Sequence, residues 1–106
     1  MPGSISGEEL PVREERATCP HTPAGLPPAP RAQGCEECLA AGGHWLHLRL
    51  CLTCGHVGCC DNSPGRHATK HFHSARHPVI QSFEPGETWG WCYLDERELG
   101  PFSPLR

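Results

Sequence analysis

Two pairs of cysteines, each separated by two residues, constrain this 106-residue chain more than any other feature. The first pair is Cys35 and Cys38 in CEEC, and the second is Cys51 and Cys54 in CLTC. A CxxC turn offers two thiolates to one zinc ion, which needs four ligands, so each pair requires two more donors from elsewhere. Eight histidines accompany the eight cysteines, and imidazole is zinc's other preferred donor. Disulfides have no use for histidine, so the pattern predicts metal sites.

The N-terminal segment indicates the compartment. Residues 1–17 are polar, carry charges of both signs and contain no apolar run, so they predict a disordered tail and no signal peptide. No stretch of the chain is long enough to span a membrane. We therefore expect a cytoplasmic protein in which thiols stay reduced and available to metal. The expected organisation is this tail, an ordered domain over residues 18–96 and a C-terminal tail over 97–106.

Short periodic segments predict an α+β fold, with an antiparallel sheet packed on one main helix. Alternation in HWLHLRL, residues 44–50, predicts a strand with Leu46, Leu48 and Leu50 on its buried face. Two more strands are expected in PVIQSF and TWGWCYLDE. Only 37 % of the residues are hydrophobic, and such a small core needs a staple, which zinc would supply.

The run GRHATKHFHSAR predicts the main helix. Ser63 is a suitable N-cap, Pro64 suits the first turn, and Pro78 ends the helix. His67 and His71 are four residues apart, so they share one helical face as candidate ligands, the alternative being solvated histidines. A thioredoxin-like redox role for the CxxC pairs would need a βαβ pattern, which is absent.

The full order of motifs is CPH, CEEC, LCLTCGHVGC, RHATKHFHSARHPV and WGWCYLDE. In this combination the chain resembles the ubiquitin-specific-protease-type zinc finger, the zf-UBP domain, over about residues 18–96. The resemblance implies two interleaved, cross-braced zinc sites. One consists of Cys35, Cys38, Cys59 and His67, and the other of Cys51, Cys54, His71 and His77. The family's spacing after the second CxxC selects Cys59 over Cys60.

Some members of the family hold a third zinc ion. The resemblance implies that Cys19, His21 and Cys92 would contribute to it here. Asp95 stands where those members have the last cysteine, and a carboxylate oxygen can also bind zinc. We therefore expect two zinc ions, with a third if Asp95 completes its site.

Many members capture the free C-terminal diglycine of ubiquitin in an aromatic pocket with an arginine clamp. The resemblance implies a protein-interaction module in which Trp91 and Tyr93 bind a peptide C-terminus and Arg49 or Arg66 supplies the charge. Ubiquitin-binding members commonly read CGR from the third cysteine onward. Here Asp61 and Asn62 follow the cysteine pair, and an acid repels an incoming carboxylate, which argues against ubiquitin itself.

Two other classes of function remain as alternatives. Arg66, Lys70 and Arg76 could bind nucleic acid, but the net charge of −3 counts against this. Cys60 could serve a thiol-based enzyme, but the sequence offers it no evident triad partner, and structural zinc sites keep no open position for chemistry. We expect no catalysis.

Overall fold

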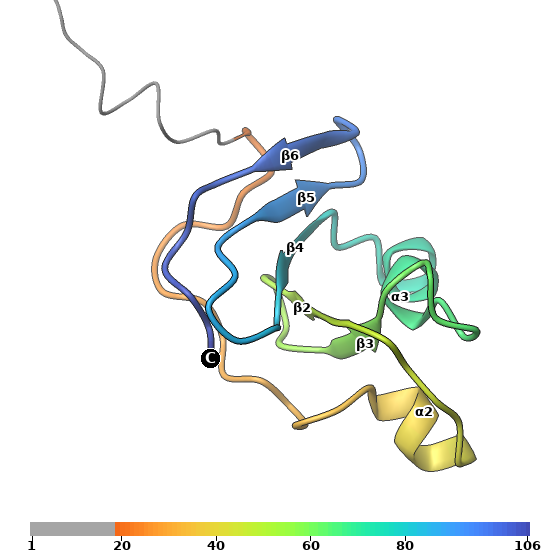
Figure 1. Cartoon of the computed structure of the whole chain (residues 1–106). Coiled ribbons are helices and arrows are strands. Elements are labelled where there is room, and N and C mark those ends of the chain that lie inside the picture. Colours follow the sequence, from red (N-terminus) through yellow and green to blue (C-terminus); the bar gives the residue numbers. More distant parts are fainter. Residues whose placement is uncertain (1–18) are drawn as a thin grey trace, which may run out of the picture.

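The computed structural model describes residues 19–106, so the tail expected over residues 1–17 lies outside the described part of the chain. The described residues form an antiparallel sheet packed on one main helix, as the sequence predicts; the sheet has five strands, and a second, short helix is present (Figure 1). The strand order is β3-β2-β4-β5-β6, and helix α3 packs against β2 and β3 at one end of the sheet. The elements are α2 Glu36–Ala41, β2 Leu48–Cys51, β3 Val57–Cys59, α3 His67–Ala75, β4 Val79–Ser82, β5 Gly90–Cys92 and β6 Arg97–Leu99.

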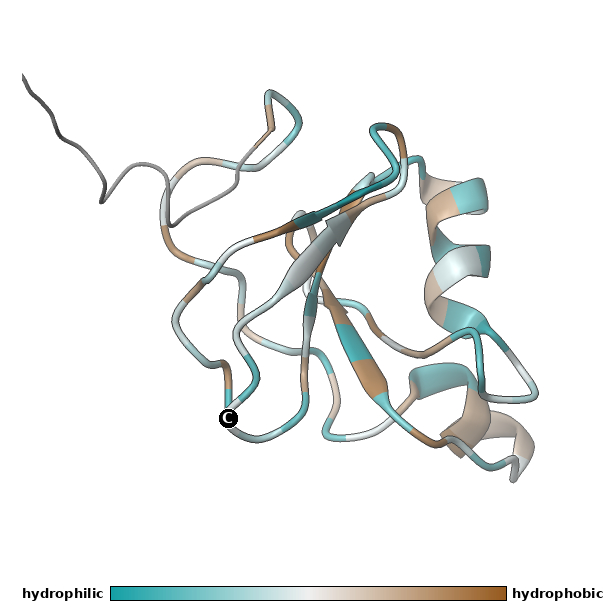
Figure 2. Ribbon diagram, turned by 45° about the horizontal axis from the view of Figure 1, so that its top comes forward, coloured by the Kyte–Doolittle hydropathy of each residue, from teal (hydrophilic) through white to brown (hydrophobic). Residues whose placement is uncertain are grey.

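The core is small and continuous with the cysteines. Leu48 and Leu50 of β2 are buried while Arg49 between them is only half-buried. In Figure 2, hydrophobic (brown) and hydrophilic (teal) segments alternate along the ribbon of the sheet. Four cysteines (Cys35, Cys38, Cys59 and Cys92) belong to the same buried cluster as the apolar side chains. The residues that could hold metal therefore also pack the fold.

The strand and helix starts differ from the sequence expectation, and one residue explains both differences. Leu46 is 60 % exposed, its N–H donates to the Ser63 hydroxyl at 2.8 Å, and β2 begins only at Leu48. Ser63 is buried, where its hydroxyl accepts the Leu46 N–H, and it is therefore not the N-cap of α3. The helix begins at His67, after Arg66 in a left-handed conformation (φ 51°) without a side-chain cap.

The chain beyond residue 96 continues the sheet, where the sequence predicts a tail. Arg97–Leu99 form β6, which pairs with β5, and Phe102 and Leu105 pack against the core. In β6 only Leu99 is buried. Three residues with a single buried position give no readable alternation, which is why sequence periodicity misses this strand. The six-residue α2 and the three-residue β3, which is buried throughout, are likewise too short to show a periodic pattern. Among the described residues, no helix has the length and apolarity needed to cross a membrane.

Candidate metal centres and an aromatic pocket

The first cluster unites α2, β3 and the start of α3. Cys35 is the N-cap of α2, where its sulfur accepts the Cys38 N–H at 3.4 Å. His67 Nδ1 lies 3.2 Å from the Cys35 sulfur and 3.4 Å from each of the sulfurs of Cys38 and Cys59. All four donor atoms lie within 4.8 Å of one another, and the three cysteines are buried. One imidazole facing three converging thiols fits a tetrahedral Cys3His zinc site.

The second cluster joins the end of β2 and the β2–β3 turn to the middle of α3 and the segment after it. Cys51 Sγ lies 3.5 Å from His77 Nδ1, and Cys54 Sγ lies 3.4 Å from His71 Nε2. Gly55 closes the turn at φ 83°, and any side chain there would collide with the Ala29 carbonyl. The set fits a Cys2His2 zinc site.

The protonation of these groups suits metal binding. Burial, together with the neighbouring imidazoles of His56 and His77, lowers the pKa of His71 to about 4, so this ring is neutral and free to donate a lone pair. Burial raises the pKa of the Cys35 thiol to about 12. A buried thiol of this kind ionises when a metal replaces its proton, so zinc binding would release protons.

A third cluster ties the start of the described chain to β5. Cys92 Sγ lies 3.6 Å from His21 Nδ1, which is 3.4 Å from Asp95 Oδ2. Cys19 completes the group, whose donor atoms also lie within 4.8 Å of one another. Asp95 thus points into the cluster where a cysteine would otherwise stand. This cluster is more exposed than the other two.

Cys59 and Cys60 face opposite sides of the chain. The Cys59 sulfur enters the first cluster, whereas that of Cys60 lies 3.4 Å from the Ser63 hydroxyl. Burial acts to raise the pKa of the Cys60 thiol, but hydrogen bonds from Ser63 and the His47 backbone outweigh it and lower the pKa to about 7. The His47 side chain also hydrogen-bonds this thiol and contributes to the lowering of its pKa.

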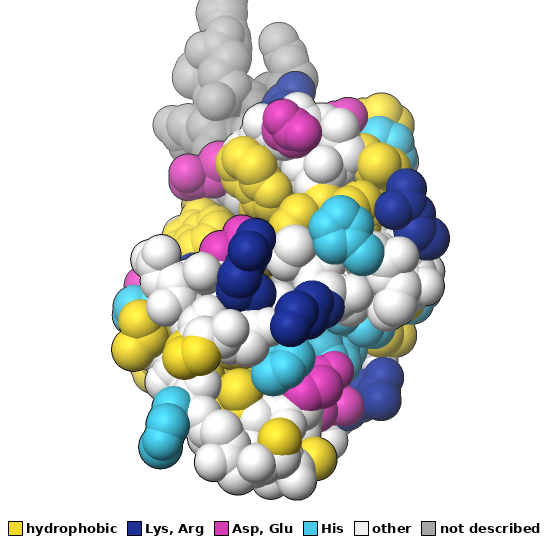
Figure 3. Space-filling view, turned by 90° about the vertical axis from the view of Figure 1, so that its right-hand side faces the viewer, with side chains coloured by type: hydrophobic (Ala, Val, Ile, Leu, Met, Phe, Trp, Pro, Cys, Tyr) yellow, Lys and Arg dark blue, Asp and Glu magenta, His cyan; other side chains and the backbone are white. Residues whose placement is uncertain are grey.

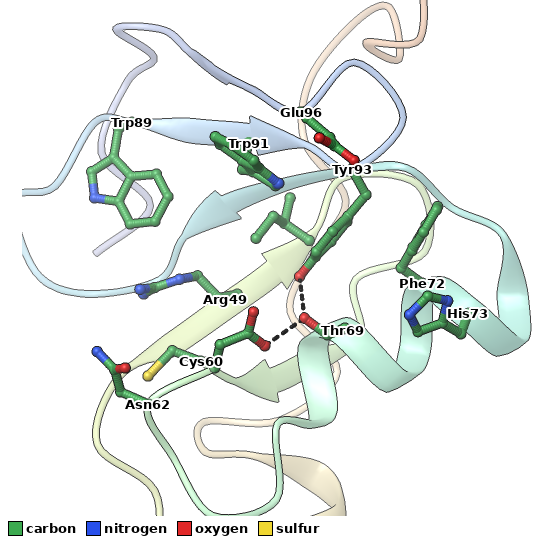
Figure 4. A pocket seen from close by; sticks show the side chains of 12 residues that line it. Arg49, Cys60, Asn62, Thr69, Phe72, His73, Trp89, Trp91, Tyr93 and Glu96 are labelled. Carbon is green, nitrogen blue, oxygen red and sulfur yellow. Dashed lines mark hydrogen bonds between the residues drawn. The ribbon is translucent and has the colours of Figure 1, made fainter.

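A surface pocket of about 530 Å³ opens between α3 and strands β2, β4 and β5 (Figure 4). Three residues predicted from the sequence or its resemblance line it: Trp91, Tyr93 and Arg49. Arg66 does not; its Nε is 3.5 Å from Asp61 Oδ1. Arg49 is fixed by donating to the Leu48 carbonyl at 2.9 Å and by lying 4.5 Å from the centre of the Trp89 ring.

Residues of α3 that sequence reasoning missed line the side of the pocket opposite Arg49. Phe72 stacks on Tyr93, with ring centroids 4.7 Å apart. The Thr69 hydroxyl lies 3.3 Å from the Tyr93 hydroxyl and donates to Asp61 at 2.6 Å, as the dashed lines in Figure 4 show. Burial raises the pKa of Tyr93, which keeps the phenol neutral as a hydrogen-bond donor. Phe72 lies one helical position beyond His71, and its aromatic character was the one available signal.

The cations of α3 form no continuous basic surface. In Figure 3, Lys and Arg side chains on this face alternate with acidic, histidine and apolar ones. Arg66 pairs with Asp61, and the Arg76 guanidinium lies 4.9 Å from the centre of the Phe72 ring. This arrangement offers little to a nucleic-acid backbone, which requires clustered free cations.

Comparison with known proteins also indicates a zinc finger. The zf-UBP family, described as "Zn-finger in ubiquitin-hydrolases and other protein", matches residues 35–102. The chain is 43 % identical over 76 residues to human ubiquitin carboxyl-terminal hydrolase 45, covering 61 % of this chain and 9 % of that protein. It is 32 % identical over 81 residues to human BRCA1-associated protein, covering 76 % of this chain and 13 % of that protein. The chain thus spans only about a tenth of these relatives' length.

A solved structure matches over most of both chains. The solution NMR structure of protein RPA1320 from Rhodopseudomonas palustris is 49 % identical, with a TM-score of 0.70. The match covers 84 % of this chain and 97 % of that one.

Proposed function

This chain belongs to the zf-UBP family of zinc fingers, and from that membership we propose that it is a protein-interaction module that binds the free C-terminus of a peptide. In this proposal zinc is structural. Each of the first two clusters holds one ion through its four cysteine and histidine side chains, and Asp95 completes a third, more exposed site. The metal fixes the turns and helix that carry the pocket, and takes no part in chemistry.

The observation that carries the proposal is the fixed cation beside an aromatic slot. Arg49 is held by Leu48 and Trp89, so little side-chain entropy is lost when it binds a carboxylate. Trp91 and Tyr93 continue the wall away from it. A flexible peptide tail is recognised by backbone hydrogen bonds and its terminal charge, and these three side chains provide partners for both.

Asp61, which follows the cysteine pair, is the residue that counts against ubiquitin as the ligand. Its carboxylate already accepts the Thr69 hydroxyl and pairs with Arg66, which offsets part of its repulsion toward an incoming carboxylate. The relatives that are ubiquitin hydrolases make the ubiquitin tail one peptide worth testing, but the proposal names only a free peptide C-terminus.

A non-enzymatic role fits the same geometry. The Cys60 thiol lines the pocket but is 6 % exposed and bonded to Ser63. Activation of a thiol nucleophile by an adjacent base requires a side chain such as histidine within hydrogen-bond reach. The His47 side chain does contact Cys60, so the burial of the sulfur, and not the lack of a base, counts against a thiol enzyme.

The test is a titration of the zinc-loaded protein with a pair of peptides ending in Gly-Gly, one with a free C-terminus and one amidated. Binding is followed by the fluorescence of Trp89 and Trp91. We expect the free acid to bind more tightly by about 10- to 100-fold, which is the value of about 1.5–3 kcal/mol for a charge-assisted hydrogen bond. Equal affinity for the two peptides would remove the carboxylate clamp.

A matched pair of arginine variants identifies the clamp. Arg49→Gln should abolish the difference between the two peptides, because the pocket then offers a carboxylate no fixed cation. Arg66→Gln removes the same charge from outside the pocket lining and should preserve most of the difference. The reverse pattern would transfer the role to Arg66.

A further inference from the structure

A buried histidine lies between the two interleaved clusters and belongs to neither. His56, in the turn between β2 and β3, is 4 % exposed. Its ring stacks on that of His71, with centroids 4.0 Å apart and planes within 7° of parallel. Its Nε2 lies 2.7 Å from Glu37 Oε2, and because a carboxylate only accepts, the imidazole donates this bond. His56 therefore connects a residue of the second cluster to helix α2.

Both ends of this contact reach metal-ligand positions. Glu37 stands between Cys35 and Cys38 in α2, and its Oε1 lies 3.8 Å from the Cys35 sulfur. On the other side, the His56 carbonyl accepts the N–H of Cys51 at 2.8 Å. One hydrogen-bonded pair thus contacts the first cluster through a carboxylate and the second through a ring and a backbone carbonyl.

We infer that the Glu37–His56 pair couples zinc binding at the two clusters, so that filling one favours filling the other. Closing either cluster around zinc orders α2 or the β2–β3 turn, and the pair then holds the partner segment in its binding geometry. When the second ion binds, part of the chain is already ordered, so its binding costs less conformational entropy. This is positive cooperativity. Glu37 and His56 are positioning residues in this account and do not touch the metal. The inference rests on the proposed zinc binding but is independent of peptide binding.

The experiment counts bound zinc ions by native mass spectrometry while zinc is added to metal-free protein. A Cys19→Ser background removes one donor of the third cluster, so that the spectrum reports the two coupled sites. Independent sites give a one-zinc species of about half the protein or more at half saturation, whereas a 20-fold coupling reduces it to about a fifth. We expect about a fifth in the background and half or more after Glu37→Ala.

Three variants distinguish coupling from general damage. Glu37→Gln keeps an amide oxygen that can accept from His56, and should keep the one-zinc species scarce. Glu84→Ala removes a comparable part-buried carboxylate, which accepts the Leu48 N–H at 2.8 Å at the opposite end of β2 from the turn that carries His56, and should leave loading unchanged. Adding His56→Ala to Glu37→Ala should produce no further rise, because the pair is already broken. Circular dichroism at saturating zinc verifies that each variant folds.

Two results would overturn the inference. One is a background protein that already passes through an abundant one-zinc species. The other is a Glu37→Ala variant that loads as cooperatively as the background. A background protein that binds fewer than two ions at saturation would instead contradict the zinc sites themselves, so the two failures are distinguishable.

Discussion

At the scale of single residues, the adjacent thiols of Cys59 and Cys60 have different surroundings and should behave differently. The Cys59 sulfur faces His67 at 3.4 Å and also accepts the N–H of that residue at 3.2 Å. Cys59→Ser should therefore lower the zinc content by one ion and destabilise the fold, because a hydroxyl is a poor zinc ligand. Cys60→Ser should leave the zinc content unchanged. Metal analysis of the two purified variants makes the comparison, and loss of zinc from the Cys60 variant would reverse the ligand choice.

A second residue-scale prediction concerns Glu87. The hydroxyl of the buried Ser82 and the indole N–H of Trp89 both donate to its carboxylate, and the Ser82 bond is the larger cause of a pKa below the ordinary 4.5. A depressed pKa in the folded state contributes stability above the unfolded pKa, and that contribution is lost as the pH falls through the folded value. Glu87 is exposed, so the contribution is small.

Carboxyl NMR of the zinc-loaded protein measures this pKa directly. The Glu87 resonance should titrate below 4.5 in the native protein and shift upward in Ser82→Ala. A midpoint that is the same in both proteins would show that the Ser82 hydroxyl does not hold the carboxylate. Glu87→Gln, which cannot titrate, identifies the resonance.

At the scale of elements, the close approach of α3 to β3 depends on Gly58. A Cβ at this position would lie 2.7 Å from the Ala68 backbone nitrogen, so a side chain must push the helix away from the strand. Gly58→Ala should cost about 1–3 kcal/mol of unfolding free energy, as overpacking does, and should weaken the first cluster because Cys59 and His67 lie on the two separated elements.

Gly43→Ala is the matched control for this prediction. A Cβ there would meet Cys38 at an ordinary 3.7 Å, so the same substitution should be nearly neutral. Denaturant unfolding at saturating zinc, with zinc affinity measured in parallel, compares the two variants. Equal stability would mean that α3 and β3 have room to separate.

The sequence predicts the elements that carry a repeated pattern and misses those set by single contacts. Leu48 and Leu50 alternate with Arg49, and His67 and His71 share a helical face, so β2 and α3 are readable. By contrast, Ser63 bonds Leu46 and does not cap α3, and β6 has Leu99 as its one buried residue. No periodicity encodes such contacts.

The candidate site divides in the same way. The resemblance to the family groups the twelve candidate ligands as the structure groups them. From spacing alone, only the two CxxC turns and the shared helical face of His67 and His71 are readable. The pocket is different. Whether Arg49 or Arg66 faces it depends on the path of the chain between Cys59 and α3, and the sequence leaves both open. The role of Phe72 as the ring beneath Tyr93 is likewise visible only once α3 is docked.

At the scale of the whole molecule, the metal clusters and the apolar core are one structure. The buried cluster of side chains includes four of the candidate ligand cysteines, so removing metal would leave unpaired thiols inside a small core. Each of the first two clusters joins α3 to a strand or turn, and the third joins residues 19–21 to β5. Two zinc ions would therefore cross-brace this domain.

Zinc stoichiometry by native mass spectrometry tests whether the two ions are present. We expect at least two ions per chain, and two should remain in the Asp95→Ala variant, because the cross-bracing clusters do not use Asp95. A third ion that disappears with Asp95→Ala would belong to the remaining cluster. One ion or none in the folded protein, or loss of more than one ion with Asp95→Ala, would contradict the cross-brace.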